Sequence, residues 1–479
     1  MVRPEQTTAV IGAGPAGLAA ARALTEVGGR PLVLERSDKV GGLSRTEEYK
    51  GFRFDVGGHR FYTRSDEIWN IWRDVIGGDF LKVRRLSRIY YNGSFFQYPL
   101  RPLGTLRRLG PLESARVIAS YAATRMRRHP QPENFEQWTI RRFGRRLYEI
   151  FFKTYTEKVW GIPCHTIAAD WADLRIGDLS LGKALRNALL GPTGIKTLIE
   201  EFHYPVLGPG MAWERMRTGI EAGGGQVLLD AEVIDLERDG LRIRRLGYRS
   251  HAKLHVIDCD RVITSMPLAD LILRMRPAPP SDVVAAARKL KYRAFIMVGL
   301  IVDRPDMFPD NWIYVHSPDV RVGRIQNFRN WSPALVPDAN RSSIGMEYFC
   351  DEGDAMWNRA DVELIEIARR ELAALGLIRG ARVVDGVVVR ETAAYPLYNR
   401  GYEREVKVIR DFVDQLENLQ TIGRNGMHRY NNQDHSMLSG ILAVRNLAGE
   451  AHDLWSVNPD AREPESSEPA ATERTTAVR

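Results

Sequence analysis

The sequence predicts an α/β protein in which a parallel-sheet domain is assembled from separate stretches of the chain. An inserted, mostly helical region and an α+β domain with an antiparallel sheet complete it. Three observations predict this fold: residues 8–17 read as a strand, a glycine turn and a helix start, apolar strands return at 226–236, 260–267 and 419–422, and strongly apolar strands occupy 292–303 and 312–315. A chain of 479 residues is long enough for two or three domains.

The glycine turn near the N-terminus has the spacing of a dinucleotide site. Gly12 permits a tight turn, Gly14 lets the backbone approach a pyrophosphate, and Gly17 lets the helix pack on the strand. The next apolar strand ends at Glu35, where a carboxylate can hold ribose hydroxyls. This context disfavours the alternative, a chance glycine turn. The predicted contacts are Gly12, Gly14, Pro15, Ala16, Gly17, Glu35 and Arg36.

A second glycine loop at 40–46 carries Arg45, and a further glycine pair at 57–58 precedes His59. This loop would bring backbone amides and a cation onto a longer, FAD-sized ligand. At these motifs the sequence resembles the FAD-binding superfamily of amine oxidases, protoporphyrinogen oxidase and UDP-galactopyranose mutase. The resemblance implies a Rossmann-like FAD-binding domain of the GR2 type, with FAD as cofactor and contacts from Gly42, Leu43, Arg45, Gly57, Gly58 and His59.

An aromatic-rich helix is predicted up to Trp160, with Gly161 as its C-cap. Residues 151–161 of this helix form the motif Phe-x-x-x-Tyr-Thr-x-Lys-x-Trp-Gly, which resembles the substrate-domain helix of UDP-galactopyranose mutases. That resemblance implies that Trp160 lies near the sugar of a nucleotide sugar. The alternative is an ordinary packed helix.

The segment 419–437 is predicted to be a strand that ends at Gly423-Arg424 and turns toward an apolar helix. It resembles the mutases' Gly-Arg-x-x-x-Tyr-x-Tyr-x-Asp string, which contacts flavin and substrate phosphates. The resemblance implies such contacts for Gly423, Arg424, Tyr430 and Asn432, and a backbone contact of Val233 with the adenine side. The sequence departs from the string, because His428 replaces the first tyrosine and Asn432 the aspartate.

Arginines also follow the second apolar strand of the substrate sheet, at Arg321 and Arg324. Guanidinium groups match phosphate oxygens, so these side chains suit a diphosphate, although solvated surface arginines are equally compatible with the pattern.

No serine, cysteine or metal-based catalytic arrangement is visible, so the flavin is expected to supply the chemistry. The resemblance implies a mutase for a nucleotide-activated or otherwise phosphorylated sugar, in which N5 of the reduced flavin attacks the anomeric carbon and displaces the phosphate. The catalytic residues would be His59, Trp160, Arg324 and Tyr430. Two alternatives stay open: an FAD-dependent oxidoreductase similar to protoporphyrinogen oxidase, amine oxidases or desaturases, and a flavoprotein that only binds.

The net charge of +8 suits an anionic substrate or surface, and the absence of a nucleic-acid module argues against nucleic acid as a partner. Seven arginines but one acid lie between Arg101 and Arg128, and the basic region continues to Arg146. It is either a solvated helix face or a peripheral contact with anionic membrane. No targeting or membrane-spanning stretch is apparent, so a cytoplasmic location is expected. The oligomeric state is not predicted.

The positions of these motifs along the chain predict its division into domains. A hairpin around Asn92-Gly93 opens the inserted region, and a Pro/Glu/Ser/Ala/Thr-rich end predicts disorder. The predicted segments are 1–87 and 201–270 (FAD-binding domain), 88–200 (inserted helical and substrate region), 271–405 (substrate-domain sheet), 406–457 (last part of the FAD-binding domain) and 458–479 (disordered tail).

Overall fold

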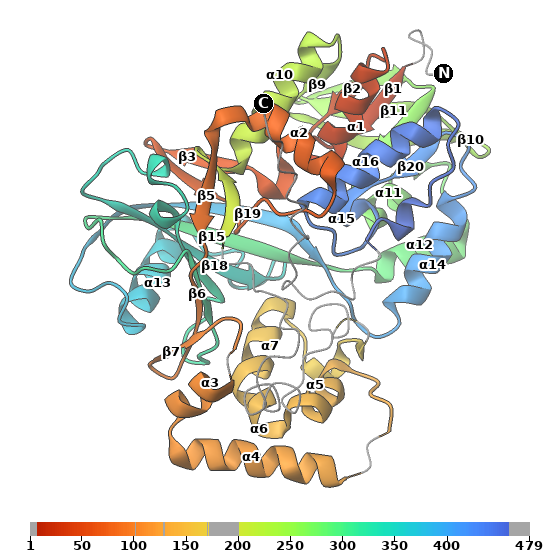
Figure 1. Cartoon of the computed structure of the whole chain (residues 1–479). Coiled ribbons are helices and arrows are strands. Elements are labelled where there is room, and N and C mark those ends of the chain that lie inside the picture. Colours follow the sequence, from red (N-terminus) through yellow and green to blue (C-terminus); the bar gives the residue numbers. More distant parts are fainter. Residues whose placement is uncertain (1–6, 101, 128–129, 170, 172–200, 459–479) are drawn as a thin grey trace, which may run out of the picture.

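The computed structural model describes residues 7–100, 102–127, 130–169, 171 and 201–458. Its first layer is a five-stranded parallel sheet in the order β20-β13-β1-β2-β9 (Figure 1). The strands are β1 (Thr8–Ile11), β2 (Leu32–Leu34), β9 (Gln226–Leu228), β13 (Arg261–Thr264) and β20 (Leu419–Thr421). Their short apolar runs are typical of a parallel sheet that is covered on both faces. The predicted strands at 226–228, 261–264 and 419–421 thus join the first two strands in one sheet, whereas the predicted strand at 232–236 belongs to a different sheet.

Helices cover this sheet and enclose the largest hydrophobic core. The first helix, α1 (Pro15–Glu26), packs against α16 (Gln433–Leu447) and α10 (Pro209–Ala222). Beside α10 lies α2 (Asp66–Ile76), whose apolar face is buried as its helical spacing predicts. The turn after β1 thus lies among elements from both ends of the chain.

A four-stranded sheet, in the order β12-β11-β10-β14, adjoins the parallel sheet. Its strands are β10 (Ala231–Asp239), β11 (Arg242–Ser250), β12 (Lys253–Asp258) and β14 (Met275–Arg276). The helices on this side are α11 (Leu268–Leu273), α12 (Ser281–Lys289) and α14 (Tyr402–Val413), with α12 packed against both of the others.

The predicted substrate sheet has seven strands, in the order β19-β15-β18-β17-β16-β6-β7, and is antiparallel except where β16 pairs with β6. Helix α13 (Asp361–Ala374) packs on β15 and β19. The predicted hairpin turns at Asn92-Gly93 and joins the edge of this sheet, so the start of the inserted region is part of the substrate sheet. The strands are β6 (Ser87–Tyr91), β7 (Ser94–Gln97), β15 (Tyr292–Val302), β16 (Trp312–Val315), β17 (Arg324–Asn327), β18 (Ser342–Cys350) and β19 (Val383–Pro396).

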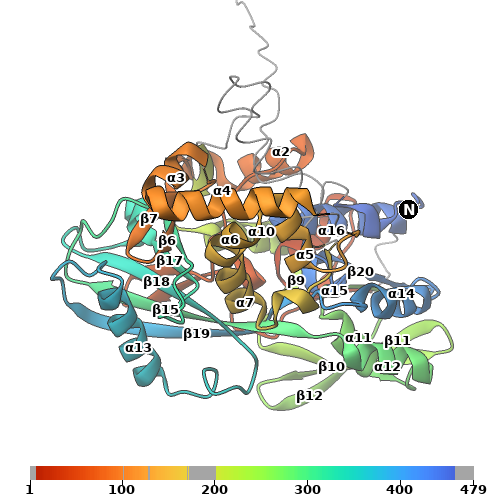
Figure 2. The ribbon, with the colours of Figure 1, turned by 90° about the horizontal axis from the view of Figure 1, so that it is seen from below.

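Two small antiparallel pairs connect the layers: β3 (Thr46–Tyr49) with β4 (Phe52–Asp55), and β5 (Phe80–Arg84) with β8 (Glu201–Pro205). A helical region lies at the end of the molecule away from the parallel sheet (Figures 1 and 2). It contains α3 (Pro102–Leu109), α4 (Pro111–Met126), α5 (Phe135–Phe143), α6 (Arg145–Tyr148) and α7 (Thr154–Trp160), with a π-helical segment, Glu149–Lys153, joining α6 to α7.

Helix α7 ends as predicted. Gly161 adopts left-handed angles, φ 66° and ψ 8°, and its N–H donates to the Glu157 carbonyl. No helix among the described residues is long and apolar enough to cross a membrane. The predicted tail beyond residue 458, the part of the inserted region at 172–200, and Arg101 and Arg128 lie outside the described residues.

Candidate functional site

The two glycine loops predicted to hold a dinucleotide meet at the carboxyl end of β1. Gly12 has φ +95°, and the Gly41 N–H donates to the Ala13 carbonyl at 2.8 Å. A Cβ on Gly42 would lie 3.2 Å from the Gly14 Cα, and a Cβ on Gly17 would lie only 1.8 Å from the Gly12 oxygen. The close approach of backbone to backbone therefore requires glycine at these positions.

The N-terminus of α1 fits an anion. Gly14 is its N-cap, no side chain caps it, and its first turn holds no acidic residue. Backbone N–H groups and the positive end of the helix dipole are thus available to a pyrophosphate. The Glu35 carboxylate, at the end of β2, accepts hydrogen bonds from the Ala13 N–H at 2.7 Å and from Ser37. These bonds fix Glu35 beside the glycine turn, where an adenosine ribose would follow the pyrophosphate.

Two other residues predicted to contact the cofactor, Arg45 and Val233, already form hydrogen bonds or ion pairs within the protein. The Arg45 guanidinium donates to the Gly42 carbonyl at 3.0 Å and is ion-paired with Glu47 and Glu391. Burial alone would lower the pKa of Arg45, but these carboxylates raise it above its ordinary value. The Val233 carbonyl accepts a hydrogen bond from Arg274. Arg45 therefore stabilises the glycine loop, and its charge is balanced without a ligand.

Arg36 and Val233 lie close to this end of the sheet. Arg36 Nη2 donates to Thr392 Oγ1 at 3.4 Å. The Ala231 N–H donates to the Glu35 carbonyl at 2.7 Å, which places the start of β10, and with it Val233, beside the end of β2. The structure thus brings together the residues predicted for the adenine end.

A second cluster forms around the Gly57-Gly58 turn. The His59 Nδ1 lies 3.2 Å from the Gly57 carbonyl oxygen. Burial, together with the nearby charges of Arg424 and Arg324, lowers the pKa of His59 to about 3. A Cβ on Gly57 would lie 3.7 Å from Arg324 Nη2. His59 is therefore a neutral imidazole that feels the charge of two guanidinium groups far apart in the sequence.

Arg324, at the start of β17, is fixed from the neighbouring strand. Its Nε and Nη2 lie 2.6 Å and 2.5 Å from Glu347 Oε2, and Gln326 Nε2 donates to Glu347 Oε1 at 2.5 Å. Glu347 is fully buried. Burial alone would lower the pKa of Arg324, but the negative charge of Glu347 raises this pKa well above its ordinary value. Of the two alternatives for this arginine, the structure shows a half-buried, oriented cation and not a solvated one.

Arg424 differs from Arg324 in its partners. Its Nε donates to the Asn431 carbonyl at 2.9 Å and its Nη1 to the Ala394 carbonyl at 3.4 Å. The guanidinium lies over the rings of Tyr430 and Tyr395, 4.8 Å and 5.6 Å from their centroids. Within the described part of the chain, no carboxylate forms an ion pair with it. This half-buried positive charge is therefore uncompensated.

Aromatic side chains connect these cations to Trp160. Tyr395 stacks on Tyr430 at 6.1 Å, and Trp160 approaches the Tyr395 ring at 6.2 Å and 73°. Burial raises the pKa of Tyr155, five residues before Trp160, well above its ordinary value. All four residues predicted to be catalytic, His59, Trp160, Arg324 and Tyr430, thus border one region, with Tyr395 between Trp160 and Tyr430.

The two departures from the mutase string have structural roles. Asn432 is the N-cap of α16, in a reciprocal capping box with His435. His428 is buried and packs against Tyr292, Tyr398 and Tyr402. Burial lowers the pKa of His428 to about 4. The neutral ring of His428 therefore belongs to this aromatic cluster, and its ring contacts are with tyrosines.

Buried polar atoms near the Gly57-Gly58 turn are open to a ligand. Gln326 Oε1 and Gln433 Oε1 are buried and have no hydrogen-bond partner in the described chain. Gln433 Nε2 donates to the Arg60 carbonyl at 3.4 Å, and a Cβ on Gly58 would lie 3.2 Å from Gln326 Oε1. Together with the uncapped α1 terminus, these atoms fit a long polar cofactor that runs from the glycine loops to this turn. No group of three His, Cys, Asp or Glu residues forms a metal site in the described ranges.

Sequence reasoning missed Glu347, Tyr155 and Tyr395 as site residues. Glu347 is the one charged residue within the apolar strand β18, and a lone carboxylate in a buried strand signals a paired cation. Tyr395 lies at the end of β19, next to Pro396. Its position depends on the long pairing of β19 with β15, which no local pattern reveals.

The close fit of α1 to the glycine turn gives a direct test of cofactor binding. The Gly17→Ala variant is expected to bind flavin about tenfold or more weakly, because the added methyl would overlap the Gly12 carbonyl and displace α1. The matched control is Gly219→Ala in α10, where the space is open and alanine favours the helix. Flavin absorbance retained after gel filtration, with titration of the apoprotein, measures the effect. Equal affinity in both variants would contradict this packing.

Comparisons with known proteins agree with the geometry. Residues 15–390 match the family described as flavin containing amine oxidoreductase. A probable UDP-galactopyranose mutase from Klebsiella pneumoniae is 29% identical over 161 residues, 32% of this chain and 40% of the relative. A dTDP-fucopyranose mutase from Escherichia coli is 27% identical over 168 residues, 33% of this chain and 43% of the relative. The matched part thus spans less than half the length of these two curated relatives.

The fold matches over nearly the whole chain. The crystal structure of reduced UDP-galactopyranose mutase superimposes with a TM-score of 0.84 at 23% identity, covering 95% of this chain and 98% of that one. The predicted α/β architecture and the resemblance to the mutases are confirmed.

Proposed function

Since the chain belongs to the family of flavin-containing amine oxidoreductases, we propose that it is a mutase that isomerises the sugar of a nucleotide-activated substrate. FAD is its cofactor. The observation that carries the proposal is the half-buried charge of Arg424, which no carboxylate of the described chain balances and which, like the charge of the oriented Arg324, acts on His59. Glu347 already pairs with Arg324, so an anion would balance Arg424, and a diphosphate is long enough to accept from both guanidinium groups.

The glycine loops and the His59 turn would hold opposite ends of FAD. The α1 terminus, with Gly12, Gly14, Pro15, Ala16 and Gly17, would bind the pyrophosphate, and Glu35 the ribose. Arg36 and the Val233 backbone would lie at the adenine. The flavin end would contact Gly57, Gly58, His59, Gly423 and Asn432, while Gly42 and Leu43 would supply the loop that Arg45 stabilises. When reduced, the flavin would supply N5 as the nucleophile that displaces the phosphate from the anomeric carbon.

The remaining chemistry belongs to the side chains of this chain. Arg324 and Arg424 bind and orient the diphosphate and stabilise the negative charge that develops on it as the anomeric bond breaks. Trp160, Tyr395 and Tyr430 present ring faces and edges that position the sugar and exclude water. His59 is neutral at physiological pH, so it can accept or donate a hydrogen bond without opposing the cations. The substrate returns to the same oxidation level, so no external oxidant is needed.

An anaerobic assay in two redox states tests this function. The purified protein is incubated with UDP-galactose or dTDP-fucose, once oxidised and once after reduction with dithionite, and the products are separated by chromatography. We expect an isomer only from the reduced protein, without net change in flavin absorbance. If the oxidised protein instead consumes substrate while its flavin becomes reduced, the protein is an FAD-dependent oxidoreductase and the mutase proposal fails.

A further inference from the structure

Helix α4 carries an exposed apolar face. Leu112, Ile118 and Met126 are 68%, 50% and 87% exposed, and Leu103 on the adjoining α3 is 60% exposed. Alanines fill the positions between them, with Ala115, Ala119, Ala122 and Ala123 all exposed. Only Val117 and Thr124 of α4 are buried against the rest of the helical region. The outward side of this helix is therefore its apolar side, the reverse of an ordinary surface helix.

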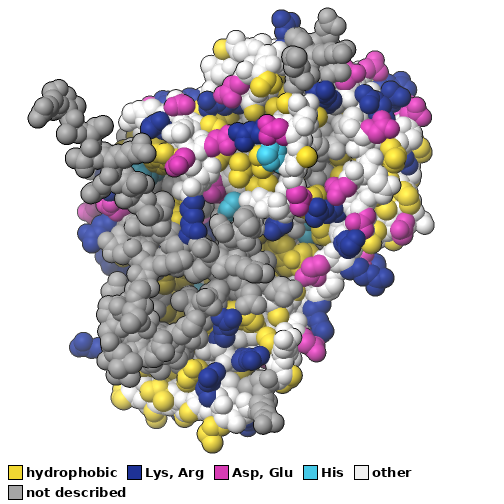
Figure 3. All heavy atoms as spheres, turned by 45° about the vertical axis from the view of Figure 1, so that its right-hand side comes forward, with side chains coloured by type: hydrophobic (Ala, Val, Ile, Leu, Met, Phe, Trp, Pro, Cys, Tyr) yellow, Lys and Arg dark blue, Asp and Glu magenta, His cyan; other side chains and the backbone are white. Residues whose placement is uncertain are grey.

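Arginines border this face on both sides. At the helical spacing of about 100° per residue, Arg116 and Arg125 fall at its two edges. Arg107 and Arg108 on α3 and Arg127 after α4 are exposed, and in the described ranges no acidic side chain pairs with these three or with Arg125. Figure 2 shows α4 lying lengthwise across the outside of the molecule, and Figure 3 shows hydrophobic and basic side chains together at that end.

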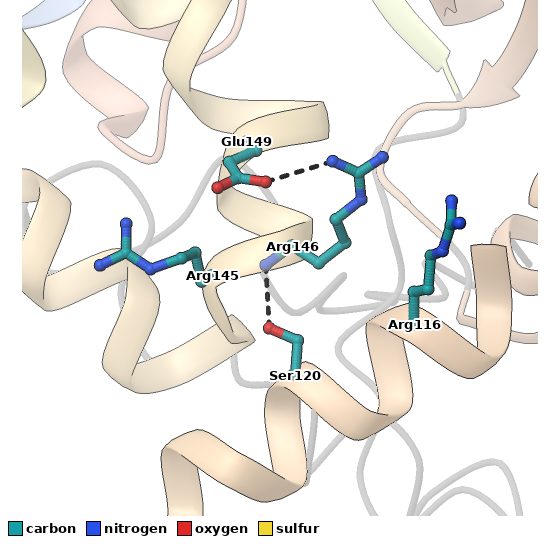
Figure 4. A pocket seen from close by; sticks show the side chains of 5 residues that line it. All are labelled: Arg116, Ser120, Arg145, Arg146 and Glu149. Atoms are coloured by element: carbon teal, nitrogen blue, oxygen red, sulfur yellow. Dashed lines mark hydrogen bonds and ion pairs between the residues drawn. The ribbon is translucent and has the colours of Figure 1, made fainter.

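A basic cavity of about 400 Å³ adjoins one edge of this face (Figure 4). Arg116 and Ser120 line it from α4, and Arg145, Arg146 and Glu149 line it from the opposite wall. Arg146 is held by Glu113 and by Glu149, which lies 3.2 Å away. Among the described residues, the acidic partner of Arg145 is Glu136, at the longer distance of 3.9 Å. Glu113 also pairs with Arg116 at 3.4 Å, so the weakly paired Arg145 is the guanidinium most available to an anion in this cavity.

We propose that the α4 face docks on an anionic lipid bilayer, with Leu112, Ile118 and Met126 in the interface and a lipid phosphate in the adjoining basic cavity. An exposed apolar stripe flanked by arginines is the pattern of helices that lie in the plane of a membrane surface. The same arginines disfavour a second copy of this chain as the occupant, because two such faces would oppose like charges. Charge complementarity therefore selects a negative surface.

Vesicle flotation of the FAD-loaded protein tests the proposal. Vesicles of neutral phosphatidylcholine are compared with vesicles that also contain phosphatidylglycerol, at low and high salt. We expect binding to the anionic vesicles only. The triple variant Leu112→Gln, Ile118→Gln, Met126→Gln and the double variant Arg107→Glu, Arg125→Glu are each expected to weaken it about tenfold or more. High salt screens electrostatic attraction, so it should weaken vesicle binding of the wild type in the same way as the charge variant does, and not as the apolar variant does.

Two matched controls distinguish binding through the α4 face from nonspecific binding through other exposed apolar side chains or through net charge. Leu254→Gln with Val256→Gln and Val362→Gln removes three equally exposed apolar side chains elsewhere. Arg30→Glu with Arg288→Glu makes the same change in net charge at exposed sites outside the helical region. Both controls are expected to bind like wild type. Absence of wild-type binding, equal losses in the controls, or a concentration-dependent dimer that the triple variant dissociates without vesicle binding would each overturn the proposal. Flavin content and the melting temperature verify folding.

Discussion

Replacement of Arg324 by methionine is expected to lower turnover of the nucleotide sugar by about 10²–10³ and the free energy of unfolding by about 3–5 kcal/mol. The activity falls because a fixed donor to the diphosphate is lost. The stability falls because Glu347, fully buried, keeps its negative charge without the cation that balances it. Steady-state kinetics of the reduced protein and urea unfolding measure the two effects.

A second variant separates these effects. In Arg324→Met with Glu347→Gln the buried charge is removed from both partners, and Gln326 can still donate to the new amide oxygen. We expect this double variant to recover most of the lost stability while its activity stays low. Recovery of both properties would show that Arg324 only supports the sheet. Failure to recover stability would show that the ion pair is not the source of the loss.

The Trp160→Ala variant is expected to lose about 3–5 kcal/mol of unfolding free energy. The indole is buried and packs against Trp171, Tyr395 and Tyr398, so its removal leaves a cavity at the centre of an aromatic cluster. Urea unfolding monitored by far-UV circular dichroism measures the loss. An unfolding free energy within 1 kcal/mol of wild type, which is below the range for such deletions, would contradict this packing.

Activity per folded molecule tells whether Trp160 also serves the substrate. The control is Trp331→Ala, a tryptophan buried to a similar degree in the core under the substrate sheet. Both variants are expected to be destabilised and to retain flavin, but only Trp160→Ala should raise KM for the nucleotide sugar. The same KM in both variants would make Trp160 a packing residue alone.

The local features of the fold were predictable because their causes are local. The glycine spacing from Gly12 to Gly17 and the end of a helix at Gly161 follow from backbone conformations that few other residues adopt. The hairpin at Asn92-Gly93 follows from the same preference. The pairing of that hairpin with β16, more than 200 residues further on, has no local signal and needed the structure.

The site was predictable only in part for the same reason. His59, Arg324 and Tyr430 could be named from motifs, but the partners that set their chemistry lie far away in sequence. Glu347 orients Arg324 from a neighbouring strand, and Glu391 neutralises Arg45 from β19. Electrostatic balance depends on such long-range contacts, so the free charge of Arg424 could not be distinguished from the paired charge of Arg45 by sequence alone.

In the proposed reaction, the anomeric bond of a nucleotide sugar breaks and re-forms on this protein without net oxidation. The most direct measurement uses UDP-galactose labelled with ¹⁸O in the oxygen that joins the anomeric carbon to the phosphate. With the reduced protein, we predict that the label moves into the non-bridging phosphate positions, at a rate that falls with Arg324→Met. With the oxidised protein, the label should stay in place. A label that remains in the bridge under reducing conditions would contradict the account.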